Sequence, residues 1–161
     1  TGALINADLT EEEKALGTSE MQAVTNYSEK LNTGSCMILG TAPSFGSKIV
    51  LNVIFSTSEY ADRISELTYK VTDAETGKVL QTLTPTGTTS ARATYDNISA
   101  GNMRRIVHIA LYDGDTVISQ TLVWSVESFV ANTLETSTNE NTRALAMATM
   151  IYGDSAAAYL G

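Results

Sequence analysis

Residues 49–55 read Ile-Val-Leu-Asn-Val-Ile-Phe, and this stretch decides the fold class. Its apolar residues Leu51, Val53 and Phe55 recur at every second position, which is the period of a β-strand. Most of the alternate positions are apolar as well, so the strand has one apolar face and a second that is nearly so. We therefore predict a β-strand here.

The same period of two extends along the chain on both sides of this stretch. Turns separate the segments: residues 75–78 form one, Asp113-Gly114 has the composition of a two-residue hairpin, and Pro43 and Pro85 are assigned to loops. The predicted strands lie in the apolar run that contains Cys36 and in residues 49–55, 67–72, 79–83, 91–95, 103–112 and 117–124. About seven short strands with a turn roughly every ten residues predict a mainly β protein, an antiparallel immunoglobulin-like sandwich.

Helical patterns appear at both ends of the chain. Residues 1–34 carry two capping signals, at Thr10 and Ser19, and the second opens a helical stretch that includes Tyr27 and Leu31. Near the other end, Ser125 is placed to cap a helix whose apolar face contains Val126, Phe129, Val130 and Leu134.

A polar loop at residues 135–141 precedes a second C-terminal helix, which we expect to start near Thr142 and to reach a C-cap at Gly153. Its expected apolar stripe is Leu145, Ala148, Ile151 and Tyr152. The organisation predicted is a helical segment 1–34, a sandwich 35–124 and a helical extension 125–161, packed together as one domain.

Composition argues against several classes of partner. The chain has 161 residues and a net charge of −8, and Arg104-Arg105 is its only adjacent basic pair, so nucleic acid is a poor candidate. No stretch approaches the length of a membrane span. The single cysteine, Cys36, can form no intramolecular disulfide, and we expect it to be a small buried hydrophobe.

The residue types on which catalysis and metal binding depend are scarce. His108 is the only histidine, and no Gly-x-Ser-x-Gly elbow accompanies it. One histidine and one cysteine are too few ligands for zinc. Asp113-Gly114-Asp115 lacks the further acidic positions of a calcium loop. We therefore predict no catalytic, cofactor-binding or metal-binding residue, and a protein that is not an enzyme.

Four segments carry a resemblance to a known module. They are residues 42–55, residues 99–113, residues 123–130 and, most specifically, residues 145–156 (Leu-Ala-Met-Ala-Thr-Met-Ile-Tyr-Gly-Asp-Ser-Ala). Together they make residues 36–160 resemble an unnamed β-sandwich module with C-terminal helices that recurs in clostridial cell-surface and dockerin-bearing proteins. The chain departs from that pattern at Trp124, where the module usually has tyrosine, and at Arg105, where it tends to be acidic.

This resemblance implies an extracellular module of a gut Gram-positive (Firmicutes) bacterium, held at the cell surface or cell wall as a monomeric part of a longer chain. Three functions stay open: adhesin-type binding of a protein, such as a host immunoglobulin; carbohydrate binding, which scarce aromatic residues disfavour; and a structural spacer. For protein binding, the candidate contacts are Tyr27 and Lys30 in the N-terminal segment, or a strand face that carries Arg104, His108 and Tyr112.

Overall fold

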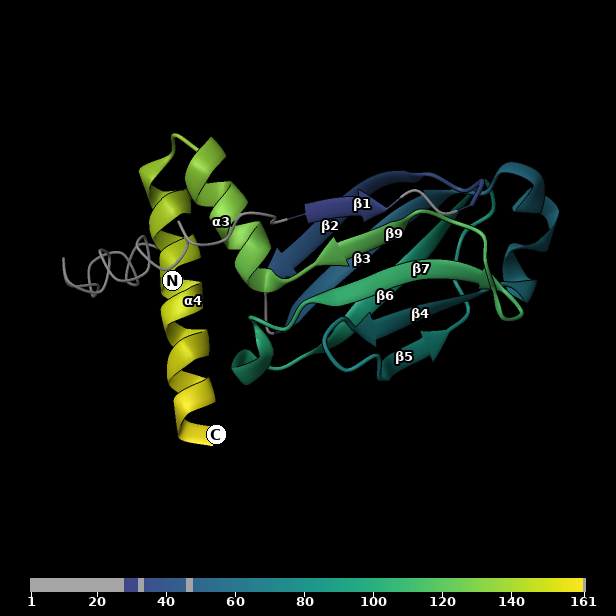
Figure 1. Ribbon diagram of the computed structural model, residues 1–161. Coiled ribbons are helices and arrows are strands. Elements are labelled where there is room, and N and C mark those ends of the chain that lie inside the picture. Colours follow the sequence, from purple (N-terminus) through teal and green to yellow (C-terminus); the bar gives the residue numbers. More distant parts are fainter. Residues whose placement is uncertain (1–27, 32–33, 46–47, 161) are drawn as a thin grey trace. The chain divides into compact units, whose positions relative to one another are not determined.

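The chain forms two compact units in a computed structural model that describes residues 28–31, 34–45 and 48–160. A β unit contains residues 29–98 and 106–124, and a helical unit contains residues 99–105 and the segment from residue 125 onward. Most of the described regular structure is antiparallel β-sheet, as the period of two predicts (Figure 1). Residues 1–27 are outside the described part of the chain, and so are the first of the two expected helices and most of the second.

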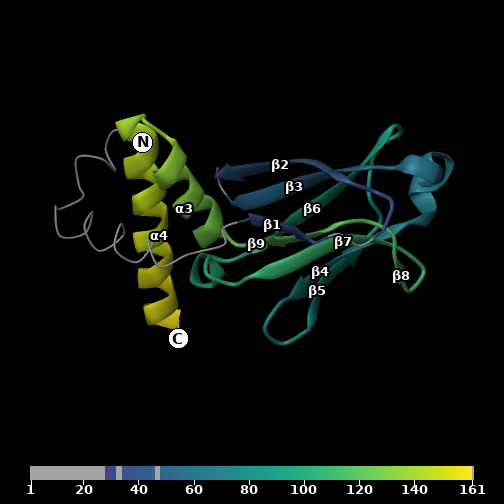
Figure 2. The same ribbon diagram turned by 45° about the horizontal axis from the view of Figure 1, so that its top comes forward.

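A large sheet and a small sheet make up the β unit. The large sheet has the strand order β1 (Ser28–Leu31), β9 (Thr121–Trp124), β7 (Val107–Asp113), β4 (Thr68–Asp73) and β5 (Val79–Leu83), and the short β8 (Thr116–Val117) pairs with β7. The small sheet has the order β2 (Ile38–Phe45), β3 (Ile49–Ser56) and β6 (Ser90–Ile98). The small sheet lies over the large one in both ribbon views (Figures 1 and 2).

Side chains that alternate along the strands build the buried core of the β unit. Leu51, Val53 and Phe55 of β3 are completely buried, as the opening stretch predicts. Val107 and Leu111 of β7 are buried in the same way from the large sheet. Burying each side chain of this size stabilises the fold by roughly 1.5–3 kcal/mol. Trp124 and Cys36 also lie in this core, with 3% and 0% exposure.

The predicted strand at 103–112 is too long. Residues 100–102 form a short 3-10 helix, η2 (Ala100–Asn102), and β7 begins only at Val107. The side chain of Met103 is buried in the turn that follows η2, so an apolar residue there indicates packing rather than strand structure. The hairpin at the other end of β7 is confirmed, one residue later than expected: Asp113 pairs with Thr116 around a turn at residues 114–115.

Pro43 lies within β2 and not in a loop, contrary to the expectation. The strand tolerates it because β2 is at the edge of the small sheet, where a residue without an N–H group need not interrupt a ladder on both sides. Pro85, by contrast, lies outside the strands as predicted.

Residues 28–31 form β1 in the large sheet, so the helix expected to extend through Leu31 is wrong at this point. The pairing of β1 with β9 explains the difference, because neighbouring strands override a weak local helical pattern. A second difference is η1 (Ser58–Glu66), a 3-10 segment that the sequence pattern did not reveal. Among its residues only Ile64 is buried, so η1 has no repeating row of buried apolar residues that a sequence pattern could indicate.

Helix α3 (Val126–Thr136) begins as predicted. The Ser125 hydroxyl accepts from the backbone N–H of Ser128, and the Ser128 hydroxyl accepts from the backbone N–H of Ser125. Val126, Val130 and Leu134 are buried along one face of α3.

Helix α4 (Glu140–Leu160) differs more from the prediction. It begins within the expected loop and continues past Gly153, so that glycine is not its C-cap. The predicted stripe is also wrong: Leu145 and Tyr152 are 42% and 66% exposed, and among the side chains of α4 that the structure describes, Ala146 and Met147 are the buried ones. Residues 144–148 are all apolar, so their pattern could not indicate which side of the helix is covered.

Candidate functional site

The outer face of the large sheet is the candidate site, because it brings together two of the residues that the sequence singled out. His108 and Tyr112 lie four residues apart on β7 and point away from the core, while Val107, Ile109 and Leu111 point into it. Both outward side chains are half-buried. The alternation predicted for this strand is therefore confirmed from residue 107 onward.

Strand β4 adds a cation to this face. Lys70 is paired with Ala110 in the β4–β7 register, so it lies diagonal to Tyr112. Its Nζ atom lies 4.5 Å from the centre of the Tyr112 ring. A cation at this distance from an aromatic face is attracted by the ring quadrupole, which holds both side chains in place.

The register neighbours of this pair on β4, β7 and β9 are uncharged, and they include both polar and apolar residues. Thr68 and Thr72 flank it on β4, opposite Tyr112 and His108 respectively, and Val123 of β9 lies on the other side of His108. Ala110, in the middle of the face, is only 3% exposed because larger side chains surround it. We call the set Lys70, His108 and Tyr112 the outer-face cluster.

Arg104 is not part of the outer-face cluster, contrary to the expectation. It lies in the turn after η2, before β7 begins, so strand alternation does not reach it. Its guanidinium forms an ion pair with Glu127 of α3, with 2.9 Å between Nη1 and Oε2. Both residues belong to the helical unit, and the pair gives Arg104 a structural partner there.

Of the two candidates from the N-terminal segment, the structure describes only Lys30, which is not part of the cluster. Lys30 is exposed on β1, an edge strand of the large sheet. Tyr27 is outside the described residues. Sequence reasoning missed Lys70, since its position beside Tyr112 depends on the register of two strands that are far apart in the chain.

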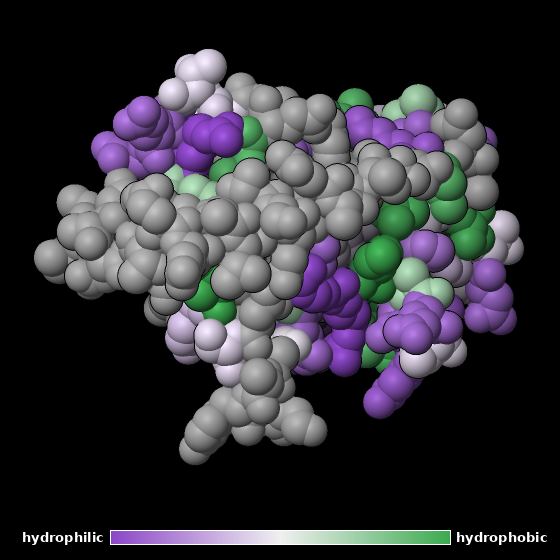
Figure 3. Space-filling view, turned by 60° about the vertical axis from the view of Figure 1, so that its left-hand side comes forward, coloured by the Kyte–Doolittle hydropathy of each residue, from purple (hydrophilic) through white to green (hydrophobic). Residues whose placement is uncertain are grey.

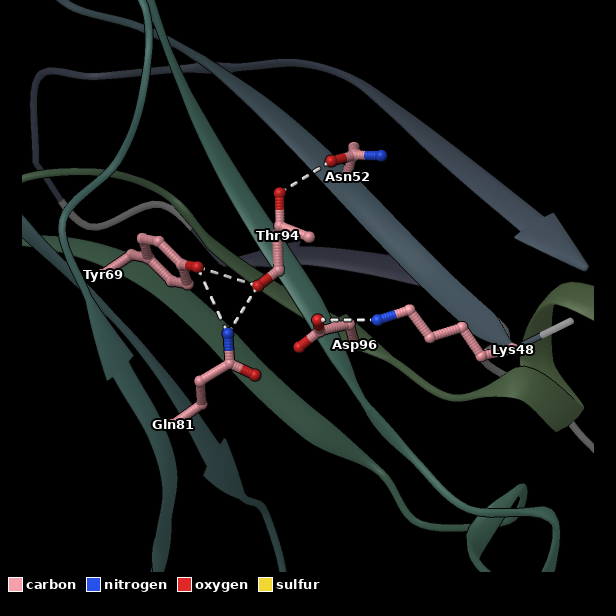
Figure 4. A network of polar contacts seen from close by, with 6 residues as sticks. All are labelled: Lys48, Asn52, Tyr69, Gln81, Thr94 and Asp96. Carbon is pink, nitrogen blue, oxygen red and sulfur yellow. Dashed lines mark hydrogen bonds and ion pairs between the residues drawn. The ribbon is translucent and has the colours of Figure 1, made fainter. Parts of the chain in front are cut away.

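A second polar arrangement, also missed, joins the two sheets. The Tyr69 hydroxyl donates to the Thr94 carbonyl at 2.8 Å, and the Gln81 amide donates to the same carbonyl at 2.7 Å. On the other side of the strand, the Thr94 hydroxyl donates to Asn52. Figure 4 shows the side chains of Tyr69 and Gln81 converging on the Thr94 carbonyl oxygen of β6, with the ion pair Lys48–Asp96 further along this strand.

The carbonyl oxygen of the Gln81 amide is buried and has no hydrogen-bond partner among the described residues. The Tyr69 hydroxyl and the Gln81 amide both donate their hydrogen bonds to Thr94, so they are not available as donors for a ligand. This arrangement is therefore a structural link between the sheets.

Acidic residues near the β7–β8 hairpin do not gather into a cation site. Arg63 of η1 reaches both Asp113, at 3.4 Å, and Glu66, at 2.8 Å. The neighbouring carboxylates hold the pKa of Arg63 above its ordinary value, first through the hydrogen bond to Glu66. Across the described ranges, no group of three or more His, Cys, Asp or Glu side chains could hold a metal ion.

On the side seen in Figure 3, the coloured residues include both hydrophobic and hydrophilic groups. In the described part of the chain, no helix combines the length and apolar character needed to cross a membrane. Comparison with family models, with curated proteins and with solved structures finds no match for this chain. The resemblance to the clostridial module therefore stays a prediction.

Proposed function

We propose that this chain is a non-catalytic protein-binding module of a bacterial cell-surface protein, with its two sheets forming an immunoglobulin-like sandwich. The observation that supports binding is the outer-face cluster, in which an aromatic ring, a lysine and an imidazole share one half-buried face. Tyrosine is enriched among the residues that dominate binding energy at protein interfaces. A host protein such as immunoglobulin is the class of partner that we propose.

The cluster favours a protein over a sugar. Sugar rings stack on exposed aromatic faces, and one face of the Tyr112 ring is already occupied by Lys70. Lys70 places a positive charge on this face of a chain whose net charge is −8. An acidic patch on the partner would be complementary to that charge. A module that serves only as a spacer has no need for such a cluster.

The test is capture of proteins from host serum and mucosal secretions on the immobilised chain, followed by purification of the captured protein and measurement of its Kd. Tyr112→Ala should raise that Kd at least tenfold, and Lys70→Ala should raise it less. Arg92→Ala, an exposed residue on β6 of the small sheet, is the matched control and should leave the Kd unchanged.

A glycan array run in parallel separates the alternatives. Sugar binding that Tyr112→Ala abolishes would replace our proposal with a carbohydrate-binding module. A chain that captures no protein and binds no glycan would be a spacer.

A further inference from the structure

Strand edges are the second kind of binding surface in a β protein, because an edge strand leaves every second N–H and C=O group unpaired. The large sheet has edges at β1 and β5, and the small sheet at β2 and β6. These edges differ in how far the protein itself covers them.

The edge of β6 is covered twice. Thr86 forms two backbone hydrogen bonds with Arg92, of 3.1 and 2.7 Å. Two residues further on, the carbonyl of Thr94 accepts from Tyr69 and Gln81. An incoming strand would have to displace these bonds, so β6 is a poor docking edge.

The edges at β2 and β1 are protected by other means. Within β2, Pro43 lacks an N–H group, and the N–H of Ile38 already donates to the Gln120 side chain at 2.8 Å. Strand β1 has four residues, of which Glu29 and Lys30 are charged. Proline, charge and shortness are the features that discourage edge pairing in natural sheets.

Strand β5 has less of this protection. Its residues, Val-Leu-Gln-Thr-Leu, include no charge and no proline, and within the described residues its backbone pairs with β4 alone. Val79 and Leu83 are 47% and 53% exposed. A strand that adds here could pair its backbone with β5 and cover both side chains.

Charge indicates what kind of strand fits. Lys78 directly precedes β5, and Lys70 is opposite Thr82 in the β4–β5 register. A second copy of the chain would bring another net charge of −8, which opposes self-association. A segment with alternate apolar residues and an acidic residue at one end complements both the strand and its lysines.

We propose that β5 is a docking edge, at which an extended segment of another protein adds as a further strand of the large sheet. This inference rests on the proposed function and names the partner as an extended apolar peptide with an acidic flank. Thr82, opposite Lys70, connects this edge to the outer-face cluster, so a bound strand would continue the proposed binding face.

The experiment uses the full chain and phage-displayed random peptides of twelve residues. We expect enrichment of peptides with alternate apolar residues and at least one acidic residue. A synthetic peptide from the selection should slow hydrogen exchange at the amides of residues 79–83. Leu83→Lys should weaken its binding at least tenfold, and the matched control Leu39→Lys, an exposed leucine on β2, should change it less than twofold.

Two outcomes would overturn the inference: no peptide is enriched, or the selected peptide protects another segment and tolerates Leu83→Lys. Circular dichroism checks that both lysine variants keep the fold, and Val79→Lys gives a second variant at the same edge. Failure at β5 is distinguishable from failure of the proposed function, since Tyr112→Ala acts on the captured host protein and not on the edge of β5.

Discussion

Cys36 shows how one buried side chain can make stability depend on pH. Its thiol is fully buried and lies 3.6 Å from the Thr57 carbonyl, to which it donates. Burial is the main cause that raises the pKa of Cys36 above its ordinary value of 9.0; a hydrogen bond with Ser35 lowers the pKa by less, and the charge of Glu59 adds a still smaller increase. The folded state therefore favours the neutral thiol more than the unfolded state does.

The sign of the effect follows from this difference. The stabilising contribution is fully present below the ordinary pKa of 9.0 and is lost as the pH rises through the higher folded pKa. We expect urea unfolding to show a free energy that falls above pH 9 and falls less steeply in Cys36→Ala. In the native protein at pH 8, iodoacetamide should label Cys36 only at the rate of unfolding. Rapid native labelling would contradict this reading.

Tyr69 and Tyr112 allow a matched comparison of hydroxyl groups. The Tyr69 hydroxyl donates to Thr94 from a side chain that is 3% exposed, whereas the described residues give the half-buried Tyr112 a contact with Lys70 through its ring and no hydrogen bond through its hydroxyl. Tyr69→Phe should lower the free energy of unfolding by about 0.5–1.5 kcal/mol, because the hydrogen bond is lost. Tyr112→Phe should change it little. Equal effects of the two substitutions in urea denaturation would show that the Thr94 link contributes nothing.

At the scale of elements, the start of α3 was the most predictable feature of the helical unit. Serine at an N-cap is a local signal, so the sequence alone located Ser125. The structure adds the reciprocal hydrogen bond, in which the Ser128 hydroxyl accepts from the backbone N–H of Ser125. The capping box here has serine at the position where glutamate is usual.

Ser125→Ala should destabilise the chain by about 1 kcal/mol through the loss of this cap. Ser155 is an exposed serine within α4, and Ser155→Ala is the matched control. Alanine is the better helix former, so that control should be neutral or slightly stabilising. Thermal unfolding followed by circular dichroism measures both. A Ser125 variant as stable as the control would rule out a role for the capping box.

The whole molecule shows where reasoning from sequence succeeds and where it stops. The strands β3, β4 and β5 were predictable because alternation is a local property, and His108 and Tyr112 could be assigned to one face for the same reason. Lys70 could not be found, because its place beside Tyr112 depends on how β4 pairs with β7.

Other features depended on context that the sequence pattern does not contain. Arg104 was misplaced because the start of β7 is set by η2 and the turn after it. Residues 28–31 join a sheet through β9, a strand that is about ninety residues away in the chain. Because residues 144–148 are all apolar, their pattern did not indicate which face of α4 is buried.

The covered carbonyl of Thr94 also limits how copies of this protein can aggregate when they are crowded. A fibre grows only if each unit offers two places for its neighbours, one ahead and one behind. With Tyr69 and Gln81 closing off β6, and with β1 and β2 protected by charge and proline, a contact at β5 has no second open edge from which to continue, as far as the described strands allow. Two hydrogen bonds to one oxygen thus remove one of the edges through which a filament could grow.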